Sequence, residues 1–235
     1  KGSVLAYTST ILSEAGYRIG RYVSPTVISY LERIQVDGAW ISEEKFAEMT
    51  SKVTDAIARL EKAGKPVPTV FEAETAIAFL YFRETQCDLV VLEAGLGGAL
   101  DATNIVRNTV CAVFSSISRD HIGIIGNTVE EIAENKAGII KPGCTVISAG
   151  QSPTVTKILK RRAAENGCPF RQAEPDQLQV LHSDHRGILL SYKEFDHIRT
   201  VMAGIYQAEN LITALEVLRA LKSQGYDISH QAVRT

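Results

Sequence analysis

The chain has 235 residues, of which 45% are hydrophobic and 22% are charged, and its formal net charge is −2. This length fits one α/β domain with at most a small appendage, and the composition excludes global disorder. The small net charge argues against a dedicated nucleic-acid binder, which is usually basic. The sequence has neither a signal peptide nor an apolar run long enough to cross a bilayer, so we expect a cytoplasmic protein without a membrane partner.

The four cysteines are Cys87, Cys111, Cys144 and Cys168. None belongs to a C-x-x-C pair, and their wide spacing gives no zinc signature. The first three lie in or beside apolar runs, which favours small buried side chains over metal ligands or nucleophiles. Free thiols of this kind fit a reducing compartment.

The first third of the sequence alternates helical and extended patterns. In chain order it predicts a helix between Ser3 and Gly16, a strand over 17–23, a helix from Ser42 toward Leu60, and a helix over 69–83. Ser24-Pro25 closes the strand, because the residue before a proline is restricted in its backbone. Ser42 is of the residue type that caps a helix N-terminus.

The middle of the chain repeats a strand and helix rhythm. Three continuous apolar runs over 88–93, 109–115 and 144–149 predict strands that are buried on both faces, as in a parallel sheet. Helical patterns over 129–140 and 155–165 lie between or after them. The sequence therefore predicts the α/β class, with a doubly wound, mostly parallel sheet.

The last part of the chain changes character. Short extended patterns at 180–183 and 187–192 flank a turn and predict an antiparallel β appendage at about 175–202. A long helix is predicted over 204–221. We interpret residues 1–235 as one domain carrying this appendage.

Four polar segments come at predicted strand ends or helix starts, where open α/β sheets bind ligands. They are Lys1-Gly2-Ser3, Ser24-Pro25, Glu93 to Gly98 with Asp101 to Asn104, and Asp120-His121 with Lys136 to Lys141. Lysine and a hydroxyl at a helix start fit the end of a phosphate loop, although a solvated terminus explains them too. A strand-ending acid before glycines fits a magnesium and phosphate site, or a tight loop with a surface acid.

The other candidate residues also allow more than one interpretation when each is considered alone. Ser24 is either a turn residue or a hydroxyl ligand of Mg²⁺ beside phosphate. His121 is either structural or catalytic, and Lys136 on a helix is ordinarily solvated. The combination and order of the segments are what carry information.

Taken together, the motifs resemble the folylpolyglutamate synthase and dihydrofolate synthase family of the Mur ligase superfamily. The segments that carry the resemblance are KGS at 1–3, YVSP at 22–25, ERIQVDG at 32–38, FE at 71–72, LEAGLGGALDATN at 92–104, SISRDH at 116–121, ENKAGIIKPG at 134–143 and YQAEN at 206–210. They follow the family order over nearly the whole chain. The resemblance implies a P-loop NTPase-like Mur ligase central domain, without most of the phosphate loop and without the C-terminal ligase domain.

The resemblance also implies site residues. For nucleotide and chemistry, it implies ATP contacts from Lys1, Gly2, Ser3, Gln207 and Asn210, and catalytic roles for Lys1, His121 and Lys136. For metal and substrate, it implies Mg²⁺ ligands at Ser24, Glu93 and His121, a carbamylated Lys136 for a second Mg²⁺, and a pterin or folate pocket at Ser24, Pro25, Thr26, Phe71 and Glu72. A carbamate turns the lysine cation into an anion that can hold a metal.

The implied reaction is glutamate addition to dihydropteroate or to tetrahydrofolate (poly)glutamate. The substrate carboxylate attacks the γ-phosphate of ATP, and the glutamate amine then attacks the acyl phosphate. The implied partners are ATP, glutamate and a dihydropteroate or reduced folate, and we expect a monomer.

Three positions depart from the family pattern: Ala99 stands where arginine is frequent, Thr26 where histidine is frequent, and Val70 where phenylalanine is frequent. Two alternatives stay open on the sequence. One is another Mur-type ligase, acting on a cell-wall precursor or another amino-acid polymer. The other is a nucleotide-binding descendant without catalysis, for which Ala99 is the main support.

Overall fold

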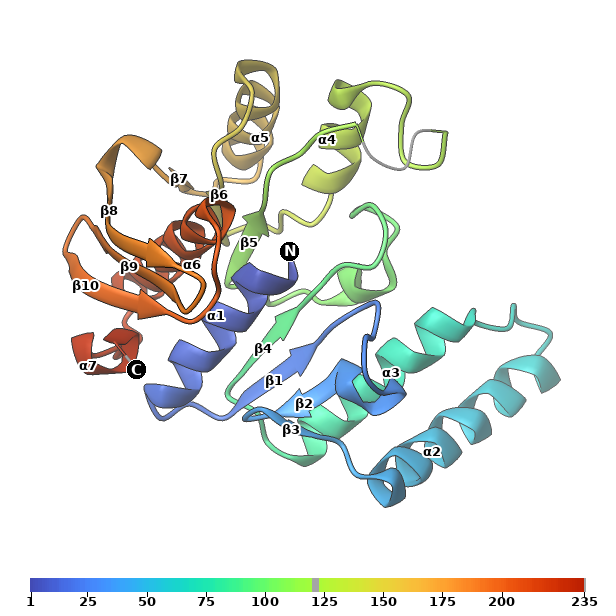
Figure 1. Cartoon of the computed structure of the whole chain (residues 1–235). Coiled ribbons are helices and arrows are strands. Elements are labelled where there is room, and N and C mark those ends of the chain that lie inside the picture. The colour runs from blue at the N-terminus through green and yellow to red at the C-terminus, as the bar shows by residue number, and fades with distance from the viewer. Residues whose placement is uncertain (120–122, 235) are drawn as a thin grey trace.

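A computed structural model describes residues 1–119 and 123–234 of the chain. It contains three separate sheets with helices packed around them (Figure 1). The α-helices are α1 (Gly2–Glu14), α2 (Glu43–Lys62), α3 (Val70–Glu84), α4 (Val129–Ala137), α5 (Pro153–Glu165), α6 (Ile205–Ser223) and α7 (His230–Arg234). The strands are β1 (Ile19–Tyr22), β2 (Ile34–Val36), β3 (Ala39–Trp40), β4 (Leu89–Leu92), β5 (Cys111–Phe114), β6 (Thr145–Ser148), β7 (Phe170–Gln172), β8 (Leu178–Asp184), β9 (Gly187–Tyr192) and β10 (Phe195–Thr200).

Helix starts follow the local sequence. The side chains of Ser42, Thr69, Thr128 and Ser152 each accept a hydrogen bond from a backbone N–H in the first turn of α2, α3, α4 and α5. These caps satisfy donors that the helix itself leaves unpaired. The predicted cap at Ser42 is therefore confirmed. No helix in the described ranges combines the length and the apolar character that a membrane crossing requires.

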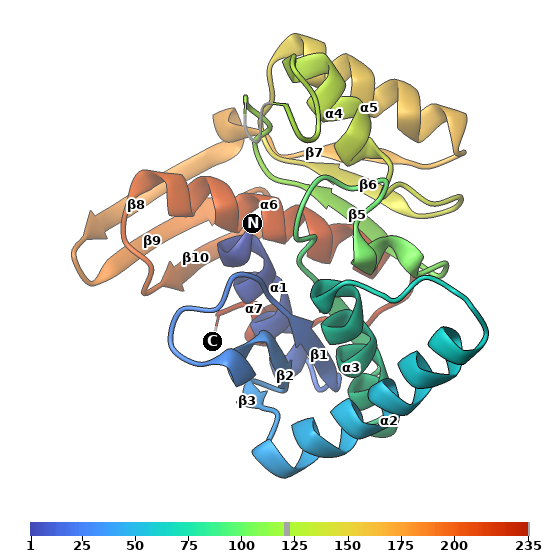
Figure 2. The ribbon, with the colours of Figure 1, turned by 90° about the vertical axis from the view of Figure 1, so that its right-hand side faces the viewer.

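The first sheet has the order β3-β2-β1-β4 and joins antiparallel to parallel pairing. β1 pairs antiparallel with β2 and parallel with β4, with Tyr22 opposite Leu92. α2 and α3 cover one face of this sheet (Figure 2). Their core includes Tyr22, Met49 and Phe82, all nearly inaccessible to solvent.

The second sheet has the order β5-β6-β7, and all of its strands run parallel. α4 and α5 pack on one face, where Val146 and Leu159 are completely buried. The other face packs on α6, so Ile147 is also buried. The prediction of a strand buried on both faces is confirmed for β6.

The same prediction is wrong for β4. Val90 is 38% exposed, and every residue of β4 retains some solvent contact. In the described part of the chain, β4 and β5 each end their own sheet and do not pair with each other. A groove of about 520 Å³ separates them and is also lined by residues of α1 and α6. β4 therefore has a strand neighbour on one side only.

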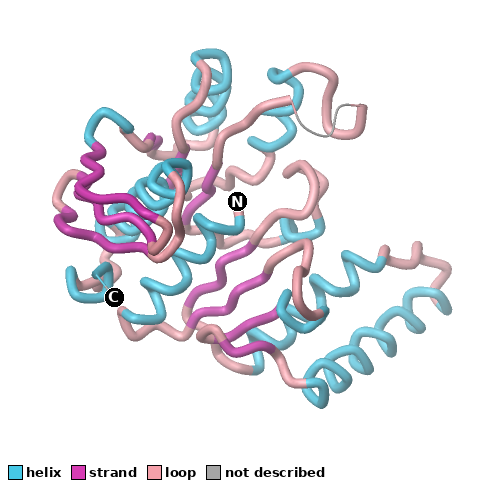
Figure 3. Tube along the Cα trace, in the orientation of Figure 1, coloured by secondary structure: helices cyan, strands magenta, loops and turns pink. Residues whose placement is uncertain are grey.

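The third sheet, β10-β9-β8, is antiparallel and lies beside α1 and α6 (Figure 3). Its two predicted strands are confirmed, and β10 adds a third that the sequence reading missed. Leu190, Tyr192 and Phe195 of this sheet pack into one core with α6, whose central residues are almost all buried. The α/β class, the parallel strands and the antiparallel appendage are thus confirmed.

The cysteines fit the sequence prediction in part. All four are free, but Cys87 and Cys111 are only partly buried, whereas Cys144 and Cys168 are buried. Burial raises the pKa of Cys111 to about 12, because a thiolate loses hydration in an apolar setting. Such thiols are poor nucleophiles at neutral pH.

Candidate functional site

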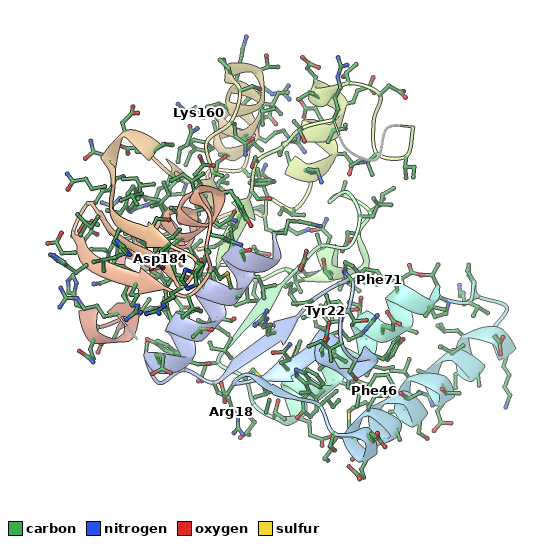
Figure 4. The ribbon with its side chains drawn as sticks, in the orientation of Figure 1. Arg18, Tyr22, Phe46, Phe71, Lys160 and Asp184 are labelled. Atoms are coloured by element: carbon green, nitrogen blue, oxygen red, sulfur yellow. The ribbon has the colours of Figure 1, made fainter. Side chains whose placement is uncertain are left out.

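The carboxyl ends of β1 and β4 meet at one edge of the first sheet. Their parallel register places Tyr22 opposite Leu92, and the N–H of Glu93 donates to the carbonyl of Tyr22 over 2.9 Å. Ser24 and Glu93 therefore leave neighbouring strands at the same edge. Phe71, from the first turn of α3, joins them: its ring centroid lies 6.0 Å from that of Tyr22 (Figure 4).

Lys1 lies above the end of β4. Its Nζ donates to the carbonyl of Ala94 over 2.8 Å and lies 3.7 Å from Glu93 Oε1. The Lys1 side chain is 47% exposed, whereas that of Glu93 is only 10% exposed. A Cβ on Gly2 would come within 3.8 Å of Glu93 Oε2, so the start of α1 faces this carboxylate. The Lys1 ammonium, the Glu93 carboxylate and the N-terminus of α1 therefore lie close together.

The glycine-rich loop after Glu93 packs directly on α4. A Cβ on Gly98 would lie 2.6 Å from the carbonyl oxygen of Lys136, so only glycine permits this approach. The N–H of Ala99 donates to the carbonyl of Asn135 over 3.0 Å. The contact brings the backbone of Lys136 to the loop that Glu93 begins.

Two polar residues of the DATN segment hold the loop in shape. Asp101 accepts hydrogen bonds from the N–H of Leu96 and of Thr103, at 2.8 and 3.0 Å. The amide of Asn104 donates to the carbonyls of Ala99 and Gly138, both at 3.1 Å. Asp101 organises the loop internally, and Asn104 ties it to the end of α4.

The other predicted site residues are placed as follows. Gln207 and Asn210 lie on α6 and bond each other, with Asn210 Nδ2 donating to Gln207 Oε1 over 3.1 Å. Glu72 caps α3 by accepting from the N–H of Thr69 over 2.7 Å, so its carboxylate already has a structural partner. Ser3 lies in the first turn of α1.

Only some of the predicted metal ligands belong to the described residues. His121 and Asp120 lie outside the described residues. Within the described ranges, no three His, Cys, Asp or Glu side chains form a cluster that could hold a metal. Ser24 and Glu93 do supply oxygen donors at one sheet edge, which is the ligand type that Mg²⁺ prefers. Their donor chemistry therefore fits a magnesium ion.

The sequence reading missed Arg21. It lies within β1, where burial lowers its pKa, and the charges of Glu93 and Glu32 oppose that shift only in part. Its Nε has no hydrogen-bond partner among the described residues. An arginine inside an apolar strand, three residues before Ser24, is the signal that could have found it.

Comparison with known proteins agrees with this geometry. The model of the Mur ligase middle domain matches residues 43–218. Dihydrofolate synthase/folylpolyglutamate synthase of Bacillus subtilis is 37% identical over 98% of this chain and 54% of its own length. The solved folylpolyglutamate synthase of Thermotoga maritima superposes with a TM-score of 0.90 at 33% identity, over 100% of this chain and 54% of that one.

A solved complex of a folylpolyglutamate synthase with AMPPCP and folate gives a TM-score of 0.91 at 26% identity, over 100% of this chain and 58% of that one. The chain thus spans about half the length of the relatives it matches. Its motifs, its fold and these similarities agree with one another. The chain belongs to the Mur ligase family, and the relatives and solved structures that it resembles here carry the names folylpolyglutamate synthase or dihydrofolate synthase.

Proposed function

We propose that the protein containing this chain is an ATP-dependent ligase that joins L-glutamate to dihydropteroate, to tetrahydrofolate (poly)glutamate, or to both, through an acyl phosphate. The observation that carries the proposal is the sheet edge where Lys1, Glu93 and the glycine-rich loop meet α4. A relative complexed with AMPPCP and folate supports the choice of substrates.

In this proposal Lys1 and the N-terminus of α1, with Gly2 and Ser3, bind the ATP phosphates. A lysine ammonium and free backbone N–H groups both stabilise phosphate charge. The 3.7 Å separation of Lys1 Nζ and Glu93 Oε1 keeps the cation within reach of the same site as the carboxylate. Gln207 and Asn210 are proposed to contact the adenine.

Ser24, Glu93 and His121 would hold Mg²⁺, and a carbamylated Lys136 would hold a second ion. When bound, the metal would neutralise charge that develops during phosphoryl transfer. Gly98 approaches the Lys136 backbone closely, and this contact between α4 and the loop that follows Glu93 supports a role for Lys136 in the site. The loop around Ser24, Pro25 and Thr26 would receive the pterin or folate together with Phe71 and Glu72.

The test follows ADP release by the whole protein with ATP, Mg²⁺ and glutamate, adding dihydropteroate or a reduced folate in turn, with and without bicarbonate. Release that requires both glutamate and a pterin would support the proposal and identify the substrate. Tight ATP binding without pterin-dependent release would favour another Mur-type substrate or a non-catalytic descendant.

A variant sharpens this test. Lys136→Ala is expected to lower kcat by about 10²-fold or more, the usual loss when one group that stabilises transition-state charge is removed. Lys157→Ala, an exposed lysine of α5, is the matched control and should retain activity. Equal activity of Lys136→Ala and wild type would contradict the assignment. Light scattering on the same samples tests the expected monomer.

A further inference from the structure

The loop from Ser24 to Ser29 is held by a single carboxylate. Glu32, in the 3-10 helix η1 (Tyr30–Arg33), accepts hydrogen bonds from three consecutive backbone N–H groups of that loop. The donors are the N–H of Val27, the N–H of Ile28 at 2.9 Å and the N–H of Ser29 at 3.2 Å. The side chain of Ser29 in turn accepts a hydrogen bond from the N–H of Leu31. Ser29 and Glu32 together form a capping box.

Side-chain packing does not hold the tip of this loop. Val27 is 89% exposed and Ile28 is 81% exposed, whereas Glu32 is only 8% exposed. Apolar side chains in water contribute almost no burial energy that could fix a loop conformation. The polar contacts to Glu32 therefore decide where the loop lies.

The carboxylate has the surroundings of a stable anion. The three N–H groups lower the pKa of Glu32, and the nearby charge of Arg21 acts in the same direction. Hydrogen bonds to a charged acceptor are stronger than those between neutral groups. A neutral amide in its place would weaken these contacts and set an NH₂ group near backbone donors.

The helix η1, which carries Glu32, is fixed to Glu74 of α3 through two of its other residues. Arg33 pairs with Glu74, and Tyr30 donates its hydroxyl hydrogen to the same carboxylate. The guanidinium of Arg33 also stacks over the Tyr30 ring, 4.2 Å from the centroid. Phe71 lies in the first turn of α3, so these contacts attach η1, and with it the loop, to the helix that carries the Phe71 ring.

We propose that Glu32 is a positioning residue: it clamps the Ser24–Ser29 loop against α3 and thereby sets the affinity for the pterin or folate substrate. The inference rests on the proposed function, because that function makes this loop part of the substrate pocket. The donors to the Glu32 carboxylate are backbone groups of Val27, Ile28 and Ser29, which follow the proposed Mg²⁺ ligand Ser24 in the chain. Loss of Glu32 should affect substrate binding and leave nucleotide binding intact.

The kinetic test compares wild type, Glu32→Gln and Glu32→Asp in the whole protein. For Glu32→Gln, the KM of the pterin or folate substrate should rise about 10- to 100-fold, as expected when hydrogen bonds to a charged group are lost. The kcat at saturating substrate and the Kd of AMPPCP should stay within about 2-fold, and Glu32→Asp should restore part of the loss.

Asp184→Asn is the matched control, because Asp184 also accepts a loop N–H, that of Arg186 at 2.7 Å, but in the distant β8–β9 turn. It should leave the substrate KM unchanged. An unchanged KM in Glu32→Gln would overturn the proposal. A parallel loss of AMPPCP affinity would also overturn it, because the effect of Glu32 would then reach the nucleotide side of the loop at Ser24 and would not be specific to the pterin or folate.

Amide hydrogen exchange provides a readout that needs no activity. In Glu32→Gln the amides of Val27, Ile28 and Ser29 should exchange faster, while those of β6 stay protected. Equal loop protection in wild type and Glu32→Gln would overturn the clamp. If wild type releases no ADP with any pterin, the proposed function fails, yet this exchange comparison still decides whether Glu32 holds the loop.

Discussion

The connection between β1 and β2 and the β5-β6-β7 sheet, which lie on either side of the groove, are stabilised by different means. The segment between β1 and β2 is fixed by charged side chains: Glu32 holds a loop, and Glu74 joins Arg33 and Tyr30 to α3. The β5-β6-β7 sheet is fixed by apolar packing, with Val146 and Leu159 completely buried.

This difference follows from whether each region must be exposed to a ligand. A loop at a ligand-binding edge must be exposed, so it cannot be held by burial of its own side chains. Hydrogen bonds and ion pairs can hold it because they are directional and act at the loop base. A scaffold strand such as β6 has no such requirement and can be covered on both faces. Four changes test the contrast, from the largest expected effect to the smallest.

Glu74→Ala should be the most destabilising change. The side chains of Glu74 and Arg33 are 9% and 11% exposed, so removing the acid leaves a buried guanidinium without its carboxylate. Loss of one partner of a buried pair typically costs about 3–5 kcal/mol. Urea denaturation measures the loss. A cost below about 1 kcal/mol would show that this region does not depend on the ion pair.

Leu159→Ala tests the apolar region. Leu159 lies on the buried face of α5 and is 0% exposed, so its truncation should cost about 2–5 kcal/mol through lost transfer energy and a cavity. Leu60→Ala is the matched control, because Leu60 is 40% exposed on α2 and should cost less than about 1 kcal/mol. Similar costs for the two leucines would contradict the assignment of the core.

Acid should loosen the Ser24–Ser29 loop before it affects β6. Backbone N–H bonds place the pKa of Glu32 below its usual value, so its contribution is complete above about pH 4.3 and is lost as pH falls through the lowered pKa. NMR shifts of the Ile28 and Ser29 amides should titrate there. The same titration in Glu32→Gln would assign it to another group.

Glu84→Gln should have the smallest effect. Glu84 bridges Lys45 and Lys52 at 2.5 and 3.0 Å, but the three side chains are 36–48% exposed. Such surface pairs contribute little, since water and salt screen them. The thermal midpoint should shift by no more than the measurement error. A clear destabilisation that disappears in high salt would show that this network matters.

The sequence located most elements because their signals are local. The serine cap at Ser42 predicted the start of α2, apolar periodicity predicted α3, and two extended patterns around a turn predicted the strand pair β8–β9; the structure confirms them. β10 was missed because its bulged register around Phe195 and Ile198 breaks the alternation that marks a strand.

The candidate site was likewise located only in part by the sequence. The motif residues Lys1 and Glu93 lie close together, with Lys1 Nζ 3.7 Å from Glu93 Oε1. The contribution of Asn104 and Gly98 to holding the loop on α4 was not visible in the motif, because their partners there are backbone groups distant in sequence. The roles that the resemblance implies for the site residues, including Lys1, Glu93 and His121, stay predictions.

The sequence by itself determined the α/β class, the order of the elements and the family, because these depend on short-range patterns and on motifs read in order. Only the tertiary structure decided that β4 and β6 differ in burial, although both are continuous apolar runs in the sequence. The reason is physical: a run of apolar residues specifies that a strand can be covered, whereas the neighbouring strands and helices determine whether it is.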